Sequence, residues 1–159
     1  SIGVKICKNF IELRKNGKEL IKKYKTLVVE NFIGGQEIQV AVMNGKSLGA
    51  IELKPKRKFY DYKAKYSKSA QTLHLMPAHL SNKKYNEVLS LAKKAHKALK
   101  CRGVTRSDFK FKNNKFYLLE INTQPGMTDL SLVPEIAKYS GLSFKNLVKK
   151  IIDDASINR

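Results

Sequence analysis

The sequence has few of the features that stabilise extracellular domains or anchor proteins in membranes. Its two cysteines, Cys7 and Cys101, lie far apart and outside any CxxC motif or Cys/His cluster. We therefore expect reduced thiols, without a disulfide scaffold or a zinc site. No apolar run approaches the roughly 20 residues of a membrane-spanning helix. The first residues also lack the basic and apolar regions of a signal peptide. These absences predict a cytoplasmic protein with no membrane partner.

Acidic residues and arginines are also scarce. The chain has 13 Asp and Glu against 32 Lys and Arg, of which only five are arginines, and its net charge is +19. A charge of this sign suits nucleic acid, an anionic membrane or a phosphate-bearing ligand. However, arginine is the preferred donor to bases and phosphates, whereas the 27 lysines are dispersed from Lys5 to Lys150. Dispersed lysines are typical of a solvated surface, so a nucleic-acid partner is not favoured.

The chain does have the composition of a folded domain. Its hydrophobic content is 42% over 159 residues, which fits one domain or a fragment of a larger enzyme. Residues 9–24 predict a helix with Asn9 as its N-cap. The stretch TLVVENF (residues 26–32) predicts a short buried strand. Alternating apolar residues on either side of Asn44-Gly45 predict a hairpin.

The second half of the chain continues this α+β pattern. Residues 54–80 mix basic and aromatic side chains without a regular face, and structureless segments of this length are usually functional, such as a lid. An amphipathic helix follows over NKKYNEVLSLAKKAHKALK, then a hairpin around Asn113-Asn114. Two short helices complete the chain, from about Leu132 to Tyr139 and from Ser143 to about Asp153, separated by Gly141. The three histidines show no metal-binding spacing and are expected to be structural or exposed.

Two carboxylates on the second hairpin indicate a metal site. Asp108 and Glu120 are twelve residues apart, so a loop with an odd number of residues would place them opposite each other, and Arg106 opposite Asn122. Like charges directly opposed on a sheet are destabilising. A hard cation such as Mg²⁺, completed by substrate phosphates, would explain the pair. The alternative is that Arg106 pairs with one carboxylate while the other faces water.

Five stretches, taken in order, resemble the D-alanine–D-alanine ligases, a family of ATP-grasp enzymes. They run from Ser1 to about Ile152 and are SIGVKICKN, VVENFIGGQEIQVAV, FYDYKAKYS, GVTRSDF and LLEINTQPGMTDLSLVPEIAKYSGLSFKNLV. The resemblance implies an ATP-grasp α+β fold, with a largely antiparallel sheet, flanking helices and a long lid loop. Residues 1–29 would end the central subdomain. Residues 30–159 would form the C-terminal subdomain with the catalytic loop and metal site. The resemblance starts partway through the family's pattern, which implies that these residues correspond to roughly the second half of such an enzyme.

The resemblance also implies the reaction and its central residues. ATP would activate one D-alanine as an acyl phosphate, and the amine of a second would attack it, for peptidoglycan precursor synthesis. Asp108, Glu120 and Asn122 match the ligands of two Mg²⁺ or Mn²⁺ ions. Arg106 and the amide N–H of Gly126 match the groups that stabilise the tetrahedral intermediate.

Further matches concern the second substrate and the lid. Ser131 and Leu132 would hold the carboxylate of the second D-alanine at the start of a helix, where amide groups favour an anion. In the lid, Lys65 would contact phosphate and Tyr66 would orient the substrates, with Ser1 bonded to that tyrosine. The Lys-Tyr pair favours an amide over an ester product. A homodimer is possible for the full-length enzyme.

The same resemblance implies a nucleotide site. Glu30, Asn31, Phe32 and Ile33 would contact adenine, and Glu37 would hold the ribose hydroxyls. Leu119, on the second hairpin, would also contact the nucleotide. Lys110 departs from the family pattern, which has an apolar residue there; it would reach nucleotide phosphate or turn away if a bulge shifts the register.

Two other functions stay open from the sequence. Another ATP-grasp carboxylate–amine ligase would keep Glu120 and Asn122 but need neither SLVP nor YDYKAKY. A basic nucleic-acid-binding domain would instead use the charge and the lid tyrosines for phosphates and stacked bases.

Overall fold

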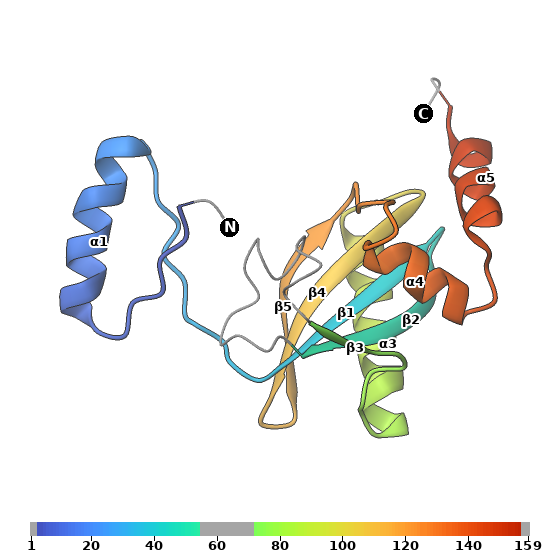
Figure 1. Cartoon of the computed structure of the whole chain (residues 1–159), viewed down its shortest axis with the longest axis horizontal. Coiled ribbons are helices and arrows are strands. Elements are labelled where there is room, and N and C mark those ends of the chain that lie inside the picture. The colour runs from blue at the N-terminus through green and yellow to red at the C-terminus, as the bar shows by residue number, and fades with distance from the viewer. Residues whose placement is uncertain (1–2, 55–71, 157–159) are drawn as a thin grey trace.

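A five-stranded antiparallel sheet forms the centre of the molecule, with helices on both of its faces (Figure 1). The computed structural model describes residues 3–54 and 72–156. The strand order is β3-β2-β1-β4-β5. The strands are β1 (Gln36–Met43), β2 (Lys46–Lys54), β3 (Leu73–Leu75), β4 (Val104–Lys112) and β5 (Lys115–Asn122). The helices of the described ranges are α1 (Phe10–Lys23), α3 (Asn82–Ala98), α4 (Leu132–Tyr139) and α5 (Phe144–Asp154). The expected α+β architecture is confirmed.

Both hairpins turn where the sequence predicts. Asn44 and Gly45 join β1 to β2 with φ angles of 47° and 73°. Asn113 and Asn114 join β4 to β5 with φ angles of 49° and 62°. Two successive residues with positive φ match the right-handed twist of the flanking strands, and asparagine and glycine tolerate this conformation. Local turn chemistry therefore determines where each hairpin reverses.

Strand β1 is buried on both faces, because a different helix covers each. Ile38, Val40 and Val42 pack with Val88 and Ala92 of α3 in one apolar cluster. Their neighbours on the opposite face, Ala41 and Met43, belong to a second cluster with α4 and α5. The α4 side covers only part of its sheet face, which leaves room for polar side chains near the start of β1.

The helix boundaries follow the predicted caps. Asn9 Oδ1 accepts a hydrogen bond from the Glu12 amide at 2.9 Å at the start of α1. Gly141 follows α4 with a φ of 83°, and its amide donates to Lys138 O at 3.0 Å. This left-handed residue ends α4 and allows α5 to start at a new angle.

Two predictions about the first half of the chain are wrong. TLVVENF forms no strand: Val28 is 87% exposed and Val29 is 67% exposed. The apolar run lacks a neighbouring strand within the described residues, so its backbone has nothing to pair with. The segment 54–80 is not structureless throughout, since Leu73–Leu75 forms β3 against the end of β2. The lid stretch FYDYKAKYS lies outside the described residues.

Helix α1 stands away from the sheet and is joined to it by an extended segment (Figure 1). None of its residues is buried, and Phe10 is 74% exposed. In the part of the chain that the structure describes, no helix has the length and apolar character needed to cross a bilayer.

Candidate functional site

The expected carboxylate pair forms, and a β-bulge produces it. Asp108 faces Glu120, and Arg106 faces Asn122, across the β4–β5 ladder. The turn itself contains two residues, not the odd number that the sequence suggested. The register shifts between Asp108 and Phe109, because Phe109 pairs with Leu118 and so leaves Leu119 as an extra residue on β5. Bulges bend a strand and re-aim its side chains, which suits the edge of a binding site.

Arg106 is the counter-charge of this pair. Its Nε lies 2.7 Å from Asp108 Oδ1 and its Nη2 lies 2.9 Å from Asp108 Oδ2. The same Nη2 lies 3.8 Å from Glu120 Oε1. The side chain of Asp108 is only 7% exposed, whereas that of Glu120 is 59% exposed. The structure thus shows the arrangement predicted as the alternative to a metal site: Arg106 pairs with Asp108, and Glu120 faces solvent.

The donor set of this face nevertheless fits a hard cation. Two carboxylates and one amide side chain occupy neighbouring paired positions, and oxygen atoms are the ligands that Mg²⁺ prefers. Asn122 Oδ1 accepts from the Gln124 amide at 2.9 Å, which fixes the side chain and leaves its second lone pair. Among the described residues, no three His, Cys, Asp or Glu side chains form a metal cluster. The metal ligands therefore remain a prediction.

A second polar pair lies two residues further along the same face. Lys110 Nζ contacts Glu37 Oε2 at 2.6 Å, and the two side chains are 18% and 12% exposed. The residues are directly opposite each other in the β1–β4 ladder. Since side chains alternate along a strand, Arg106, Asp108 and Lys110 share one face. Lys110 therefore does not turn away, and the bulge on β5 leaves β4 regular.

One polar residue of this face is absent from the sequence-based site. Gln39 is fully buried opposite Asp108, and neither its Nε2 nor its Oε1 has a hydrogen-bond partner among the described residues. A buried amide without partners is costly. The alternation of β1 could have revealed it, because Gln39 has the same parity as Glu37.

The loop after β5 brings Gly126 and Ser131 together. Ser131 Oγ accepts from the Thr128 amide at 2.9 Å and lies 2.9 Å from Thr128 Oγ1. A Cβ on Gly126 would lie 2.7 Å from Ser131 Oγ, so a side chain at position 126 would displace the Ser131 hydroxyl. Ser131 is the N-cap of α4 without bonding its own helix, and Leu132 is buried in the core. The predicted helix start is confirmed, and the first N–H groups of α4 face the N-terminal side of the helix, where this loop lies.

The expected adenine segment lies in the extended chain before β1. Glu30, Asn31 and Phe32 are exposed, and Ile33 is partly buried. Gly35 then has a φ of 104°, and a Cβ there would overlap Phe111 O. This glycine allows the segment to cross the end of β4 closely. On β5, Leu119 is 49% exposed. Ser1, Lys65 and Tyr66 lie outside the described residues.

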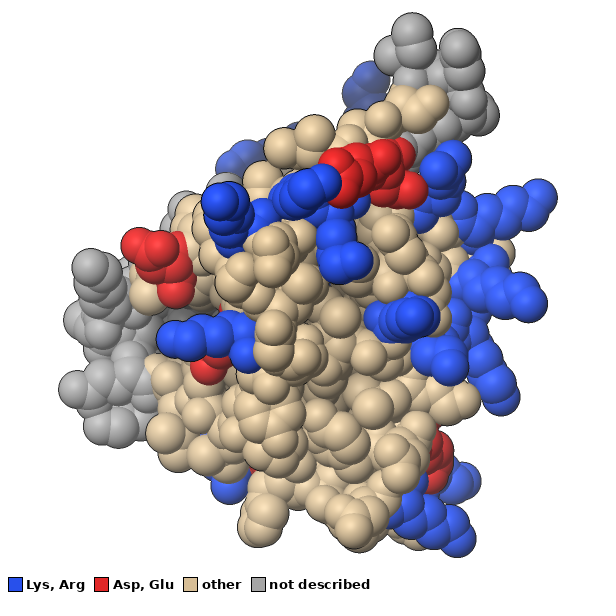
Figure 2. All heavy atoms as spheres, turned by 90° about the vertical axis from the view of Figure 1, so that its right-hand side faces the viewer, with Lys and Arg blue, Asp and Glu red and all other residues tan. Residues whose placement is uncertain are grey.

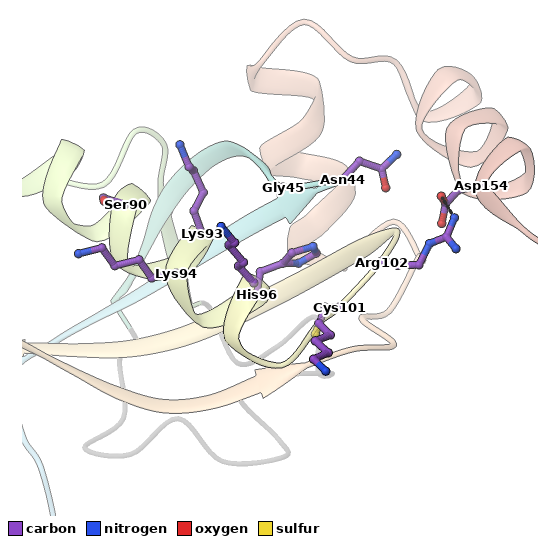
Figure 3. A pocket seen from close by; sticks show the side chains of 11 residues that line it. Asn44, Gly45, Ser90, Lys93, Lys94, His96, Cys101, Arg102 and Asp154 are labelled. Carbon is purple, nitrogen blue, oxygen red and sulfur yellow. Dashed lines mark hydrogen bonds and ion pairs between the residues drawn. The ribbon is translucent and has the colours of Figure 1, made fainter. Parts of the chain in front are cut away.

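A basic hollow of about 770 Å³ lies at the C-terminal end of α3 and contains none of the expected site residues. On the α5 side of the molecule, basic side chains lie mainly along the upper and right-hand edges of the view, around a middle with few charged residues (Figure 2). In the hollow, however, Lys93 and Lys94 point in different directions, and Arg102 pairs with Asp154 at 3.2 Å (Figure 3). Diverging lysines do not make a convergent anion site and agree with a solvated surface.

The buried titratable group of this hollow is His96, which links α3 to β4. Its Nδ1 lies 2.8 Å from Thr105 Oγ1. Burial lowers the pKa of His96 below 6.5, and a hydrogen bond with the backbone of Cys101 opposes that shift. His74 also serves the fold, because its Nδ1 contacts Glu135 of α4 at 2.7 Å. These histidines are structural, as predicted.

Comparison with known proteins decides which family this geometry belongs to. A family model described as "D-ala D-ala ligase C-terminus" matches residues 1–153. The chain belongs to this family. A D-alanine–D-alanine ligase of Pelagibacter ubique is 60% identical over 159 residues, which are 100% of this chain and 52% of the relative. One from Geotalea uraniireducens is 45% identical, over 99% of this chain and 51% of the relative. The chain thus spans about half the length of the curated relatives it matches.

Solved structures of D-alanine–D-alanine ligases have the same fold as this chain. The D-alanine–D-alanine ligase of Bacillus anthracis, crystallised with ATP, matches with a TM-score of 0.81 and 32% identity. The match covers 96% of this chain and 50% of that structure. A ligase from Coxiella burnetii matches with a TM-score of 0.77 and 28% identity. The ATP-grasp fold expected for this chain is confirmed.

Proposed function

We propose that this chain supplies the nucleotide and metal part of a D-alanine–D-alanine ligase. The observation that carries the proposal is the paired placement of Asp108 with Glu120 and Arg106 with Asn122, in a member of this ligase family. The ATP complex of the Bacillus anthracis ligase supports ATP as the phosphoryl donor. The product would serve peptidoglycan precursor synthesis in the cytoplasm. A homodimer is compatible with this role.

The reaction joins two D-alanines in two steps. A carboxylate oxygen of the first D-alanine attacks the γ-phosphorus of ATP, which releases ADP and forms an acyl phosphate. The amine of the second D-alanine then attacks the carbonyl carbon; the C–O bond to phosphate breaks, and the nitrogen loses a proton. Activation is necessary because a free carboxylate is a poor electrophile.

Asp108, Glu120 and Asn122 would hold two Mg²⁺ or Mn²⁺ ions. When bound, these ions neutralise charge on the phosphates during transfer. Arg106 now neutralises Asp108, at 2.7 and 2.9 Å. With cations at the carboxylates, the guanidinium would turn toward the reacting carbonyl. There it would share the developing negative charge with the Gly126 amide.

Ser131 and the first amides of α4 would bind the carboxylate of the second D-alanine. The residues proposed for the nucleotide are those before and on the sheet: Glu30, Asn31, Phe32, Ile33, Glu37 and Leu119. Lys65, Tyr66 and Ser1 would close the site and exclude water that could hydrolyse the acyl phosphate. Residues 1–29 would belong to the central ATP-grasp subdomain and residues 30–159 to the C-terminal one.

The direct test is dipeptide formation by the intact protein. With ATP, Mg²⁺ and D-alanine it should release ADP, phosphate and D-alanyl-D-alanine. With L-alanine it should not form a dipeptide, and D-lactate should not replace the second D-alanine. ATP-dependent ligation of a different carboxylate and amine, without dipeptide from D-alanine, would exclude the proposed substrates.

Glu120→Gln tests the carboxylate pair. A neutral amide is a weaker ligand for a hard cation, so we expect turnover to fall by about 100-fold or more and the Mg²⁺ requirement to rise. The fold should survive, since one of two facing negative charges is removed. Activity is titrated against Mg²⁺ in both proteins. The control is Asp153→Asn on α5, where the carboxylate is similarly exposed at 57%. An unchanged Mg²⁺ dependence in Glu120→Gln would show that Glu120 is not a ligand.

A further inference from the structure

The Lys110–Glu37 pair has more hydrogen-bonding capacity than its protein partners use. The ammonium has three donors, and one is used by Glu37 Oε2 at 2.6 Å. Within the described residues, neither side chain has another hydrogen-bond partner, so Glu37 Oε1 and two ammonium donors remain available. Yet the side chains are only 18% and 12% exposed. Such groups are poorly placed for bulk water and well placed for a ligand.

The position of the pair along the sheet limits what that ligand can offer. Lys110 is two residues from Asp108 on the same strand face, a distance of about 7 Å along β4. Glu37 is opposite Lys110 on β1. The face therefore has a carboxylate for a cation at Asp108 and, about 7 Å along β4, an ammonium with a second carboxylate beside it on β1. An ammonium suits an anionic oxygen, whereas the second carboxylate suits hydroxyl donors and repels phosphate.

A nucleoside triphosphate has groups that suit both places. Its outer phosphates bind cations, its innermost phosphate carries negative oxygens, and its sugar carries hydroxyls. We infer that Lys110 donates a hydrogen bond to the phosphate nearest the ribose, while Glu37 holds the ammonium and offers its other oxygen to the sugar. This inference rests on the proposed function, and it adds a phosphate contact to the described half of the site. Asp108 would not compete for Lys110, because Arg106 neutralises it in this structure and cations would do so with nucleotide bound.

The test is the affinity of the intact protein for adenosine, AMP, ADP and ATP, measured by calorimetry with Mg²⁺ present. Lys110→Met removes the ammonium and keeps an unbranched chain. We expect it to weaken AMP, ADP and ATP equally, by about 10-fold to 100-fold, because each loses one charge-assisted hydrogen bond. Adenosine, which has no phosphate, should bind within about threefold of its affinity for the wild type. The matched control is Lys94→Met on α3, an exposed lysine away from the site, which should leave all four affinities unchanged.

Three results would overturn the inference. An equal loss for adenosine would mean that Lys110 only positions Glu37. A loss confined to ADP and ATP would place the ammonium at an outer phosphate. No loss for any nucleotide would make the ion pair purely structural. Absence of ATP binding by the wild-type protein would instead overturn the proposed function, so the two failures are distinguishable.

Lys110→Met leaves Glu37 mostly buried without a partner, which is destabilising. The double variant Lys110→Met/Glu37→Gln removes both charges and keeps the test valid if the single variant unfolds. In that background the inference predicts the same additional loss for AMP over adenosine, relative to Glu37→Gln alone. Equal affinities of the double and single variants for AMP would contradict it.

Discussion

At the residue scale, the sheet face that carries Asp108 combines groups that the fold alone does not need. Gln39 has two buried polar atoms without partners in the described ranges 3–54 and 72–156, and Lys110 and Glu37 form a largely buried ion pair. Each of these features costs free energy that an apolar pair of similar volume would avoid. Their concentration on one face agrees with a surface organised around a polar ligand.

Gln39→Leu should therefore raise the stability of the protein. Leucine fills nearly the same volume and removes an amide that has no hydrogen bond to any described residue. We expect the free energy of unfolding to rise by about 1–3 kcal/mol, measured by urea denaturation. Gln36→Leu on the same strand is the control, because Gln36 Nε2 donates to His79 O at 3.3 Å and its loss should not stabilise. A loss of stability in Gln39→Leu would mean that solvent already satisfies the amide.

His96 should make stability dependent on pH. Burial lowers its folded-state pKa below the unfolded value of 6.5, so protons bind the unfolded chain more readily. Its contribution is complete above pH 6.5 and is lost as the pH falls below 6.5 toward the folded-state pKa. We expect His96→Gln to reduce the loss of unfolding free energy between pH 7.5 and 5.5, measured in urea. His79→Gln, at an exposed histidine, should retain the wild-type pH dependence. Equal dependence in all three proteins would exclude His96 as the source.

At the element scale, the bulge at Leu119 determines how β5 presents Glu120 and Asn122. Deleting Leu119 would make the ladder regular, since Leu118 would still pair with Phe109 and Glu120 with Asp108. The fold should survive, but the bend that the bulge imposes would be lost.

We expect the Leu119 deletion to weaken ATP–Mg²⁺ binding by about 10-fold or more in the intact protein, on the scale of groups that orient metal ligands. Leu119→Ala retains the bulge and trims only the side chain, so it should weaken binding less. Calorimetry measures affinity, and circular dichroism checks folding. If both variants lose the same affinity, the side chain matters and the bulge does not.

The same bulge shows what the sequence can and cannot predict. The even separation of Asp108 and Glu120 correctly indicates that they lie on one face of the sheet. It does not show whether the unpaired residue lies in the turn or in a bulge, because a three-residue turn and a bulge give the same pairing of Asp108 with Glu120. Turn chemistry at Asn44-Gly45 and Asn113-Asn114 is local, so it is predicted well. The predicted strand at TLVVENF is wrong because apolar composition indicates that a segment tends to be buried. It does not indicate which other part of the protein would bury it. The Lys110–Glu37 contact depends on β1 lying beside β4, which no local pattern encodes.

At the scale of the whole molecule, the described site would, under the proposed function, be one side of a reaction that needs two substrates and ATP together. The chain covers 52% of its Pelagibacter ubique relative. Holding reactants in place contributes on the order of 7–11 kcal/mol to such reactions. Residues 1–159 alone should therefore form no detectable D-alanyl-D-alanine, although weak nucleotide binding is expected. The measurement is a dipeptide assay beside the intact protein. Turnover at even a few per cent of the intact rate would show that the active site is complete in these residues.

The separation of α1 from the sheet has a consequence for the colloidal behaviour of the chain. Phe10, Ile11 and Val28 are 74%, 79% and 87% exposed, so the N-terminal arm presents adhesive apolar surface. The net charge of +19 opposes contact between copies. That repulsion reaches about 30 Å at 0.01 M salt but only about 8 Å at 0.15 M, whereas apolar attraction is not screened. Raising the ionic strength should thus promote self-association of the isolated chain, and a buffer of low ionic strength should keep it monodisperse.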